Sequence, residues 1–192
     1  YSLLDGICMV EDLSKYCNLK PTNDIGEVAL QLEEDIAILY NGRLVAMKFC
    51  FPSGFSPMDK IGMTFAEMHA PVADNQKLQQ ASDKIIGLIS KPGAKFRRYV
   101  WTLTTSPELS RHPIYKSDEP AVSTIEKLYF RKETQTTVGF GDGRTTFFFV
   151  KVDVIPFIDL DPQVQGQAVE SLLSISDTVL EYKGLNEIKD RK

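Results

Sequence analysis

Two apolar segments separated by Asn41-Gly42 decide the fold of this sequence. The first, Asp35 to Tyr40, is Asp-Ile-Ala-Ile-Leu-Tyr, and the second, Arg43 to Phe51, is Arg-Leu-Val-Ala-Met-Lys-Phe-Cys-Phe. Asn-Gly is the strongest two-residue hairpin signal, because both positions accept the positive φ that a tight turn requires. Pro52 ends the second segment, since proline has no N–H to donate to a strand ladder. The sequence therefore predicts an antiparallel hairpin over residues 35–51.

The segments around this hairpin predict three more strands and several helices. Apolar residues at steps of three and four predict helices over residues 3–16, 76–90 and 162–180, with shorter turns near 28–32 and 64–69. Strands are expected over 95–105, 125–137 and 144–156. Strands clustered apart from helices indicate an α+β domain with an antiparallel sheet of about five strands and flanking helices. Five strands with a helical connection after the second resemble a PAS domain, which holds its ligand between sheet and helices.

The composition narrows the classes of function. The chain has 192 residues, 43% of them hydrophobic, and a formal net charge of −4. We therefore expect a single domain over residues 1–192, and no nucleic-acid surface, because such a surface needs a clustered basic excess. No apolar run reaches the roughly 18 residues that a membrane-spanning helix needs. The 3 cysteines have no paired spacing, which predicts free thiols and, with no signal-peptide pattern in residues 1–10, a cytoplasmic protein.

Two other features are interpreted structurally. Gly139, Gly141 and Gly143 lie between predicted strands, whereas a phosphate-binding loop opens a helix, so they predict a hairpin turn. Cys50 lies between Phe49 and Phe51. A thiolate there could ligate haem, but a cysteine in an apolar run is more often a small core residue, which is the interpretation we favour.

Histidine offers the best candidate for a cofactor ligand. The sequence contains 2 histidines, His69 and His112, without the paired spacing of a zinc or non-haem iron site. A haem needs only one axial ligand from the protein, so one histidine is enough. For His69 the alternative is a helix-end histidine satisfied by backbone groups. His112 lies in a polar loop before Pro113 and is expected to be exposed.

Several strings, taken in order, resemble one known family. They are Leu32-Glu-Glu-Asp-Ile-Ala-Ile-Leu39, Phe51-Pro-Ser-Gly-Phe-Ser-Pro-Met-Asp-Lys-Ile-Gly62, Glu67-Met-His-Ala-Pro-Val72, Arg98-Tyr-Val-Trp-Thr-Leu103 and Leu128-Tyr-Phe-Arg-Lys-Glu-Thr-Gln135. Their order and spacing are similar to the haem-dependent oxidative N-demethylase-like family. The resemblance runs from about Leu32 to Tyr182. The Lys-Ile-Gly and His-Ala-Pro-Val strings are its most specific parts.

The resemblance implies a PAS-like subunit that holds b-type haem. It also implies oxidative removal of a methyl group from a small secondary amine such as dimethylamine, with O2 as oxidant. The sequence has no flavin or iron–sulfur motif, so electrons would come from a separate reductase subunit that carries such a group. The oligomeric state is left open.

On this interpretation each candidate site residue has a role. His69 is the iron ligand or a distal acid, and Lys60 and Arg97 neutralise the haem propionates. Trp101 forms a wall of the pocket. Arg131 and Gln135 lie an even number of residues apart on one predicted strand, so they face the same side and line the pocket.

Two alternatives remain at the level of sequence. The chain could be a non-catalytic PAS-like sensor or binding module for haem or another small ligand, which would bind without consuming reductant. It could also be a scaffold subunit whose own side chains fill the pocket, which would purify with a partner and without a cofactor.

Overall fold

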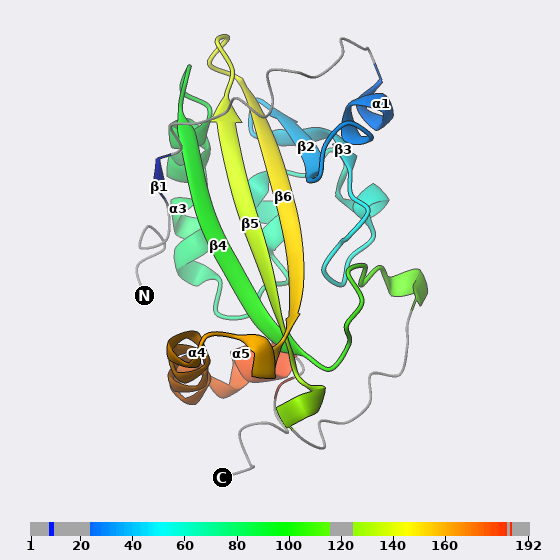
Figure 1. Cartoon of the computed structure of the whole chain (residues 1–192). Helices are drawn as coiled ribbons and strands as arrows, with labels where there is room; N and C mark the ends of the chain where they lie inside the picture. The colour runs from blue at the N-terminus through cyan, green and yellow to red at the C-terminus, as the bar shows by residue number, and fades with distance from the viewer. Residues whose placement is uncertain (1–7, 10–23, 116–124, 184, 186–192) are drawn as a thin grey trace.

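A six-stranded antiparallel sheet forms the centre of the structure (Figure 1). The structure is a computed structural model and describes residues 8–9, 24–115, 125–183 and 185. The sheet order is β1-β4-β5-β6-β2-β3. The strands are β1 (Cys8–Met9), β2 (Asp35–Tyr40), β3 (Arg43–Lys48), β4 (Lys95–Thr104), β5 (Tyr129–Gly139) and β6 (Thr145–Pro156).

The predicted hairpin is confirmed and joins β2 to β3. Asn41 and Gly42 have φ values of 49° and 73°, as a tight turn of this type requires. β2 also pairs with β6, from Asp35 opposite Val150 to Tyr40 opposite Thr145. The last strand therefore returns beside the first strand of the hairpin, which brings residues more than a hundred positions apart into one sheet.

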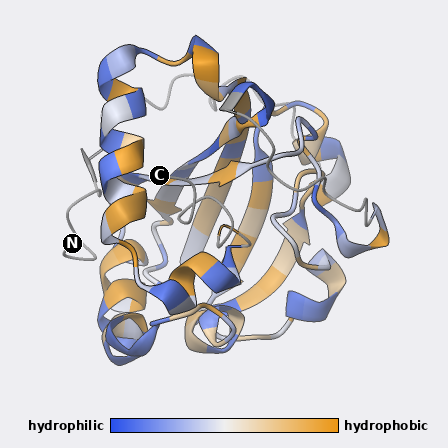
Figure 2. Cartoon of the chain, turned by 90° about the horizontal axis from the view of Figure 1, so that it is seen from below, coloured by the Kyte–Doolittle hydropathy of each residue, from blue (hydrophilic) through white to orange (hydrophobic). Residues whose placement is uncertain are grey.

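Within the described parts of the chain, five α-helices accompany the sheet. They are α1 (Ile25–Ala29), α2 (Phe65–His69), α3 (Gln76–Ile89), α4 (Pro162–Ser174) and α5 (Asp177–Tyr182). In the view of Figure 1, α2 and α3 lie behind the sheet, and α4 and α5 lie at its lower end. Seen from below, the helices surround the strands and carry hydrophobic and hydrophilic residues on different sides (Figure 2). Among the described residues, no helix combines the length and the apolar character needed to cross a bilayer.

The end of α3 lies so close to the sheet that one position must be glycine. A Cβ at Gly139 would come within 2.1 Å of the carbonyl oxygen of Lys91 and 2.8 Å of that of Ile89. This close approach requires glycine at position 139, the last residue of β5, and the predicted turn follows it. α3 therefore covers the face of the sheet toward which a Cβ at position 139 would point.

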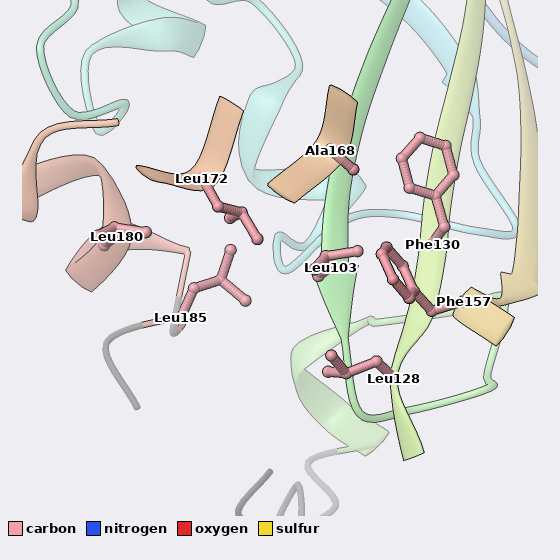
Figure 3. Packing of buried hydrophobic residues seen from close by; sticks show 8 residues of the cluster. All are labelled: Leu103, Leu128, Phe130, Phe157, Ala168, Leu172, Leu180 and Leu185. Carbon is pink, nitrogen blue, oxygen red and sulfur yellow. The ribbon is translucent and has the colours of Figure 1, made fainter. Parts of the chain in front are cut away.

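The main hydrophobic cluster lies where the lower end of the sheet meets α4 and α5 (Figure 3). Leu103 and Phe130 come from β4 and β5, Ala168 and Leu172 from α4, and Leu180 from α5. Leu103 is 1% exposed and Leu180 is 2% exposed. Burying such side chains contributes about 1.5–3 kcal/mol each relative to leaving them in water. The cluster therefore joins the C-terminal helices to the two central strands.

The predicted α+β fold with an antiparallel sheet is confirmed, and its five long strands follow the PAS-like order of hairpin, helical connection and three further strands. The single helix predicted over 162–180 is wrong. Ile175 adopts an extended backbone, with φ −74° and ψ 142°, and Ser176 caps a new helix through a hydrogen bond from the N–H of Val179.

Two smaller predictions are also wrong. Cys8 and Met9 lie in β1, opposite Arg97 and Phe96, where a helix over 3–16 was expected. The rest of that predicted helix lies outside the described residues. Cys50 is exposed and is not part of the core. The strand ends at Lys48, and the backbone N–H groups of Cys50 and Phe51 donate to the carboxylate of Asp35 instead of to a ladder.

Candidate functional site

The two faces of the sheet differ in chemistry. In an antiparallel pair, directly opposite residues share a face and successive residues alternate between faces. Arg131 lies opposite Thr102, and Gln135 lies opposite Arg98. Both share the face of Gly139, which α3 covers. We call this side, with Arg98, Arg131, Glu133, Gln135 and Asp35, the inner face, and the other side the outer face.

Arg131 is the most enclosed charged residue of the inner face. It is 2% exposed, and its guanidinium donates to the carbonyl oxygens of Leu109 (2.6 Å) and Phe51 (3.0 Å) and to the hydroxyl oxygen of Ser53. A planar guanidinium suits such a set, because its five donors point in fixed directions. The structure thus places Arg131 as the link between β5 and the two loops that cover this end of the inner face.

A row of hydrogen bonds continues along the inner face from Arg131. The hydroxyl of Ser53 donates to Glu133 Oε1 at 2.5 Å, and the amide of Gln135 donates to Glu133 Oε2 at 2.9 Å. Arg98 Nε then donates to Gln135 Oε1 at 2.7 Å. Burial lowers the pKa of Arg98, and the charge of Glu133 partly opposes that shift. Among the described residues no ion pair within 4 Å joins Arg98 to a carboxylate, and the charge that acts on it comes from Glu133.

His69 is the last residue of α2 and is partly buried. Its Nδ1 lies 2.7 Å from the carbonyl oxygen of Phe65, one helical turn earlier. A carbonyl can only accept, so Nδ1 carries the proton and Nε2 keeps its lone pair. The ring also packs on that of Phe65, with centroids 4.2 Å apart. Histidines that bind metals are commonly oriented by such a backbone hydrogen bond at the other ring nitrogen.

The surroundings of His69 favour its neutral form. Burial is the largest cause of its lowered pKa, and the positive charges of Arg98 and Lys60 lower the pKa further, while the hydrogen bond to Phe65 opposes them. Lys60 ends the short turn Pro57–Lys60, with its ammonium 6.0 Å from the ring centre of Phe55. His69 therefore lies within electrostatic reach of Lys60 and Arg98, and both charges favour the neutral imidazole.

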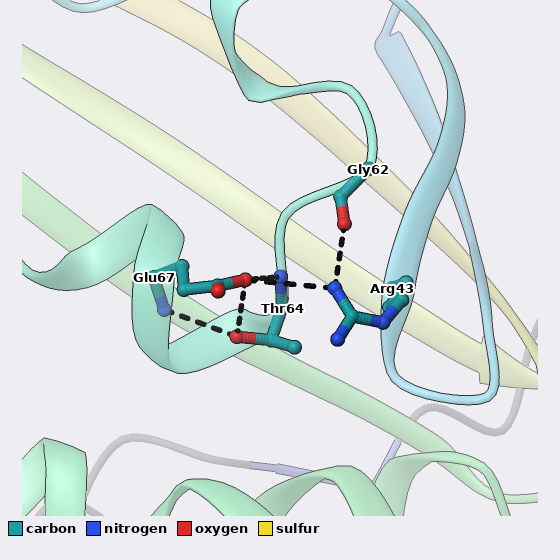
Figure 4. Close-up of polar contacts among 4 residues, drawn as sticks. All are labelled: Arg43, Gly62, Thr64 and Glu67. Carbon is teal, nitrogen blue, oxygen red and sulfur yellow. Dashed lines mark hydrogen bonds and ion pairs between the residues drawn. The ribbon is translucent and has the colours of Figure 1, made fainter.

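The start of α2 is fixed by a capping box (Figure 4). Thr64 Oγ1 accepts from the N–H of Glu67, and Glu67 Oε2 accepts from the N–H and the hydroxyl of Thr64. These hydrogen bonds, the first with the Thr64 backbone, lower the pKa of Glu67. Arg43, in the β2–β3 hairpin, donates to the carbonyl of Gly62 and lies 3.7 Å from Glu67 Oε2. The hairpin thus positions the helix that carries His69.

Arg97 and Trp101 lie on the outer face, away from Gln135 and Arg131. Arg97 donates to Thr136 Oγ1 at 3.4 Å. Trp101 stacks on Phe130 with centroids 5.4 Å apart, and its carbonyl oxygen accepts from Lys183 at 3.0 Å. Trp101 also lines a groove of about 700 Å³ between the sheet and α4. Of the six predicted site residues, Arg131 and Gln135 therefore lie on the inner face, whereas Arg97 and Trp101 lie on the outer face. His69 and Lys60 are connected to the inner face through the electrostatic effect of Arg98 on His69.

Sequence reasoning missed Arg98, Glu133 and Ser53. Strand alternation could have found Arg98, because Arg98 and not Arg97 shares a face with Gln135 once β4 and β5 are paired. Glu133 lies midway between Arg131 and Gln135, so the same alternation places it on their face. No local sequence pattern identifies Ser53 as part of the site, because its partner Glu133 is 80 residues away in sequence. His112 Nδ1 accepts from the N–H of Ile114 within its own loop.

The strand order and the helical connection after the hairpin define a PAS-like α+β protein. The model of the haem-dependent oxidative N-demethylase, alpha subunit-like family matches residues 10–191, nearly the whole sequence, so this chain belongs to that family. The resemblance seen in the sequence strings is thereby confirmed.

Other comparisons add little. The chain has a solved structural neighbour, a sensory box sensor histidine kinase from Vibrio cholerae, at 14% identity and a TM-score of 0.30. That alignment covers 67% of this chain and 88% of the kinase chain. At this level of similarity it supports no statement about ligand or activity. No curated protein sequence matches the chain significantly.

Proposed function

We propose that this chain is the haem-binding subunit of an oxidative N-demethylase that acts on a small secondary amine of the dimethylamine type. The observation that carries the proposal is the hydrogen bond from His69 Nδ1 to the carbonyl of Phe65, which leaves Nε2 free to ligate iron. Family membership over residues 10–191 supports the same cofactor. The proposal covers residues 1–192 as one cytoplasmic domain.

The residues around His69 fit a haem. Within the described residues, no three His, Cys, Asp or Glu side chains gather to hold a bare metal ion, but a b-type haem needs only one axial ligand from the protein. Haem also carries two propionates, and carboxylates are stabilised by nearby cations. Lys60 and Arg98 supply positive charge within electrostatic reach of His69. We assign the propionate role to these two residues, with Arg98 in place of Arg97, because Arg97 lies on the outer face.

Gln135 and Glu133 supply the polar lining of the pocket in this proposal. Gln135 holds Arg98 Nε and donates to Glu133, so it links the cation to the carboxylate. Arg131 does not line the pocket in this proposal. It supports the lining, because its guanidinium nitrogens donate to loop carbonyls and to Ser53. Trp101 lies on the outer face, where it stacks on Phe130, so the wall of the pocket is not assigned to it.

Haem bound at this site would supply oxygen activation. In N-demethylation one oxygen atom of O2 ends in formaldehyde and the other in water, so the reaction also needs two electrons and two protons. The sequence contains no flavin or iron–sulfur motif, so we propose a reductase partner that carries such a group. The role of this chain is to hold the cofactor, keep His69 neutral and orient its Nε2.

Turnover tests the proposal against the sensor alternative. The haem-loaded protein would be given dimethylamine, O2, and a ferredoxin with its NADPH-dependent reductase as surrogate electron donors. We expect formaldehyde and monomethylamine in equal amounts, with His69→Ala inactive as the control. A protein that binds haem but releases no formaldehyde and consumes no reductant with dimethylamine or other N-methylamines would instead be a sensor or binding module.

A further inference from the structure

The helix that carries His69 is too short to hold itself in place. α2 has 5 residues, and isolated helices shorter than about 12–15 residues are marginal in water. Its start is fixed by the Thr64–Glu67 capping box. Its end, where His69 lies, leaves the last carbonyl groups of the helix in need of donors. The position of the His69 ring therefore depends on whatever supplies those donors.

Asn75 supplies donors for two of these carbonyl groups. Its side-chain Nδ2 donates to the carbonyl oxygens of both His69 and Ala70, each at 2.9 Å. The backbone N–H of Val72 also donates to the His69 carbonyl, at 3.0 Å. One amide group from outside the helix thus holds two successive carbonyls at the helix end, one of them the carbonyl of His69 itself.

The neighbouring Asp74 fastens the same loop to α5. Ser176 Oγ donates to Asp74 Oδ2 at 2.5 Å, and Thr178 Oγ1 donates to the same carboxylate at 3.1 Å. Asp74 has a φ of +52°, a conformation that costs energy for a residue with a side chain. The bonds to α5 hold it there. Through Asp74 and Asn75, the C-terminal helices contact the end of α2.

We propose that Asn75 and Asp74 are positioning residues for the iron ligand. Asn75 fixes the end of the His69 helix, and Asp74 ties that end to α5, which the hydrophobic cluster anchors through Leu180. This inference rests on the proposed function, in which His69 ligates haem iron. On this proposal α5 helps to hold the axial ligand, although Ser176 and Asp74 are 102 positions apart in the sequence.

The test compares Asn75→Ala and Asp74→Gly with Gln165→Ala. Gly accepts the positive φ of position 74, so Asp74→Gly removes the bonds to α5 without adding strain. Gln165 is a matched control, because its side-chain Nε2 also donates to backbone carbonyls, of Phe157, Ile158 and Leu160, at 3.0–3.2 Å, but on α4. Each variant would be measured in full-length protein.

Two readouts decide the matter. In the protein without haem, hydrogen exchange at the amides of residues 68–70 and 72 is expected to accelerate about fivefold in Asn75→Ala and Asp74→Gly and not in Gln165→Ala, since a net hydrogen bond corresponds to about that factor. In the haem-loaded ferrous protein, the iron–histidine stretching band in the resonance Raman spectrum is expected to shift or broaden in the same two variants.

The outcomes separate this inference from the proposed function. If the wild-type protein shows no iron–histidine band, or keeps it in His69→Ala, the assignment of His69 fails and the positioning role falls with it. If the wild type shows the band and His69→Ala loses it, but Asn75→Ala and Asp74→Gly behave like Gln165→Ala in either readout, the positioning role alone is overturned.

Discussion

The inner face of the sheet and the hydrophobic cluster at its lower end are built on different principles. The cluster buries aliphatic and aromatic side chains from β4, β5, α4 and α5. The inner face places arginines, a glutamate and a glutamine in one hydrogen-bonded row. A buried charge costs stability unless it is paired and hydrogen-bonded, so such a row is not what a sheet needs to fold. The comparison indicates that the cluster stabilises the domain, and it supports the proposal that the inner face binds a ligand.

The largest effect is expected in the cluster. Leu103→Ala removes a side chain that is 1% exposed, and it should lower the free energy of unfolding by about 2–5 kcal/mol, because it leaves a cavity. Leu173→Ala, at a position that is 60% exposed on α4, is the control and should change it by less than about 0.5 kcal/mol. Urea unfolding measures both. Equal effects would mean that the cluster is not the centre of stability.

Arg131 tests whether the inner face also contributes to stability. Arg131→Met leaves carbonyls of two loops and Glu133 without their donor or cation, and should destabilise the protein by about 2–4 kcal/mol. The adjacent Lys132→Met is the control, since Lys132 forms a partly exposed ion pair with Asp153 on the outer face and should cost at most about 1 kcal/mol. Thermal unfolding of the two variants distinguishes the faces. If Arg131→Met left the stability of the protein unchanged, the contacts of Arg131 with the two loops would not stabilise the fold.

Arg98 and Arg97 are neighbours on β4 that lie on opposite faces of the sheet. Substituting each in turn therefore tests which face binds the ligand. Arg98→Gln should raise the haem dissociation constant about tenfold, the equivalent of one lost charge-assisted hydrogen bond. Arg97→Gln should leave it unchanged. Haem titration followed by absorbance measures both constants. The reverse pattern would place the cofactor on the outer face, beside Trp101.

The smallest expected effect is on pH dependence. Folding lowers the pKa of His69, chiefly through burial, so the unfolded chain binds a proton more readily than the folded one. The contribution of His69 to stability is therefore complete above its unfolded pKa of about 6.5 and is lost as the pH falls through the lower folded value. His69→Gln without haem should lose less stability than wild type between pH 7.5 and pH 5. Identical losses would show that the His69 ring is not buried as described.

Much of the fold follows from local signals, and much of the site does not. Asn41-Gly42 predicts its hairpin because a turn of that type tolerates few other residues. The Ser-Ile-Ser sequence at 174–176 contains the capping serine that splits the C-terminal helix, but an apolar pattern that continues through it conceals the break. Cys8 and Met9 show no strand signal, because their pairing with β4 is decided by distant residues.

The site required strand register and loop contacts that a sequence pattern does not contain. His69, Lys60, Arg131 and Gln135 fall on one side because the helical connection packs on the inner face, and their predicted roles stay predictions. The choice between Arg97 and Arg98 depends on which residue lies opposite Gln135. The contact of Ser53 with Glu133 joins a loop to the middle of a strand. Such long-range contacts can be recognised only once the sheet is assembled.

The central claim, that His69 holds a haem against the inner face, is tested most directly by an absorption spectrum. Haem would be titrated into the wild-type protein and into His69→Ala. We expect a sharp Soret band in the wild type that shifts on reduction and on addition of carbon monoxide. In His69→Ala we expect the loss of that band or of its histidine-ligated position. No band in the wild type, or an identical spectrum in the two proteins, would contradict it.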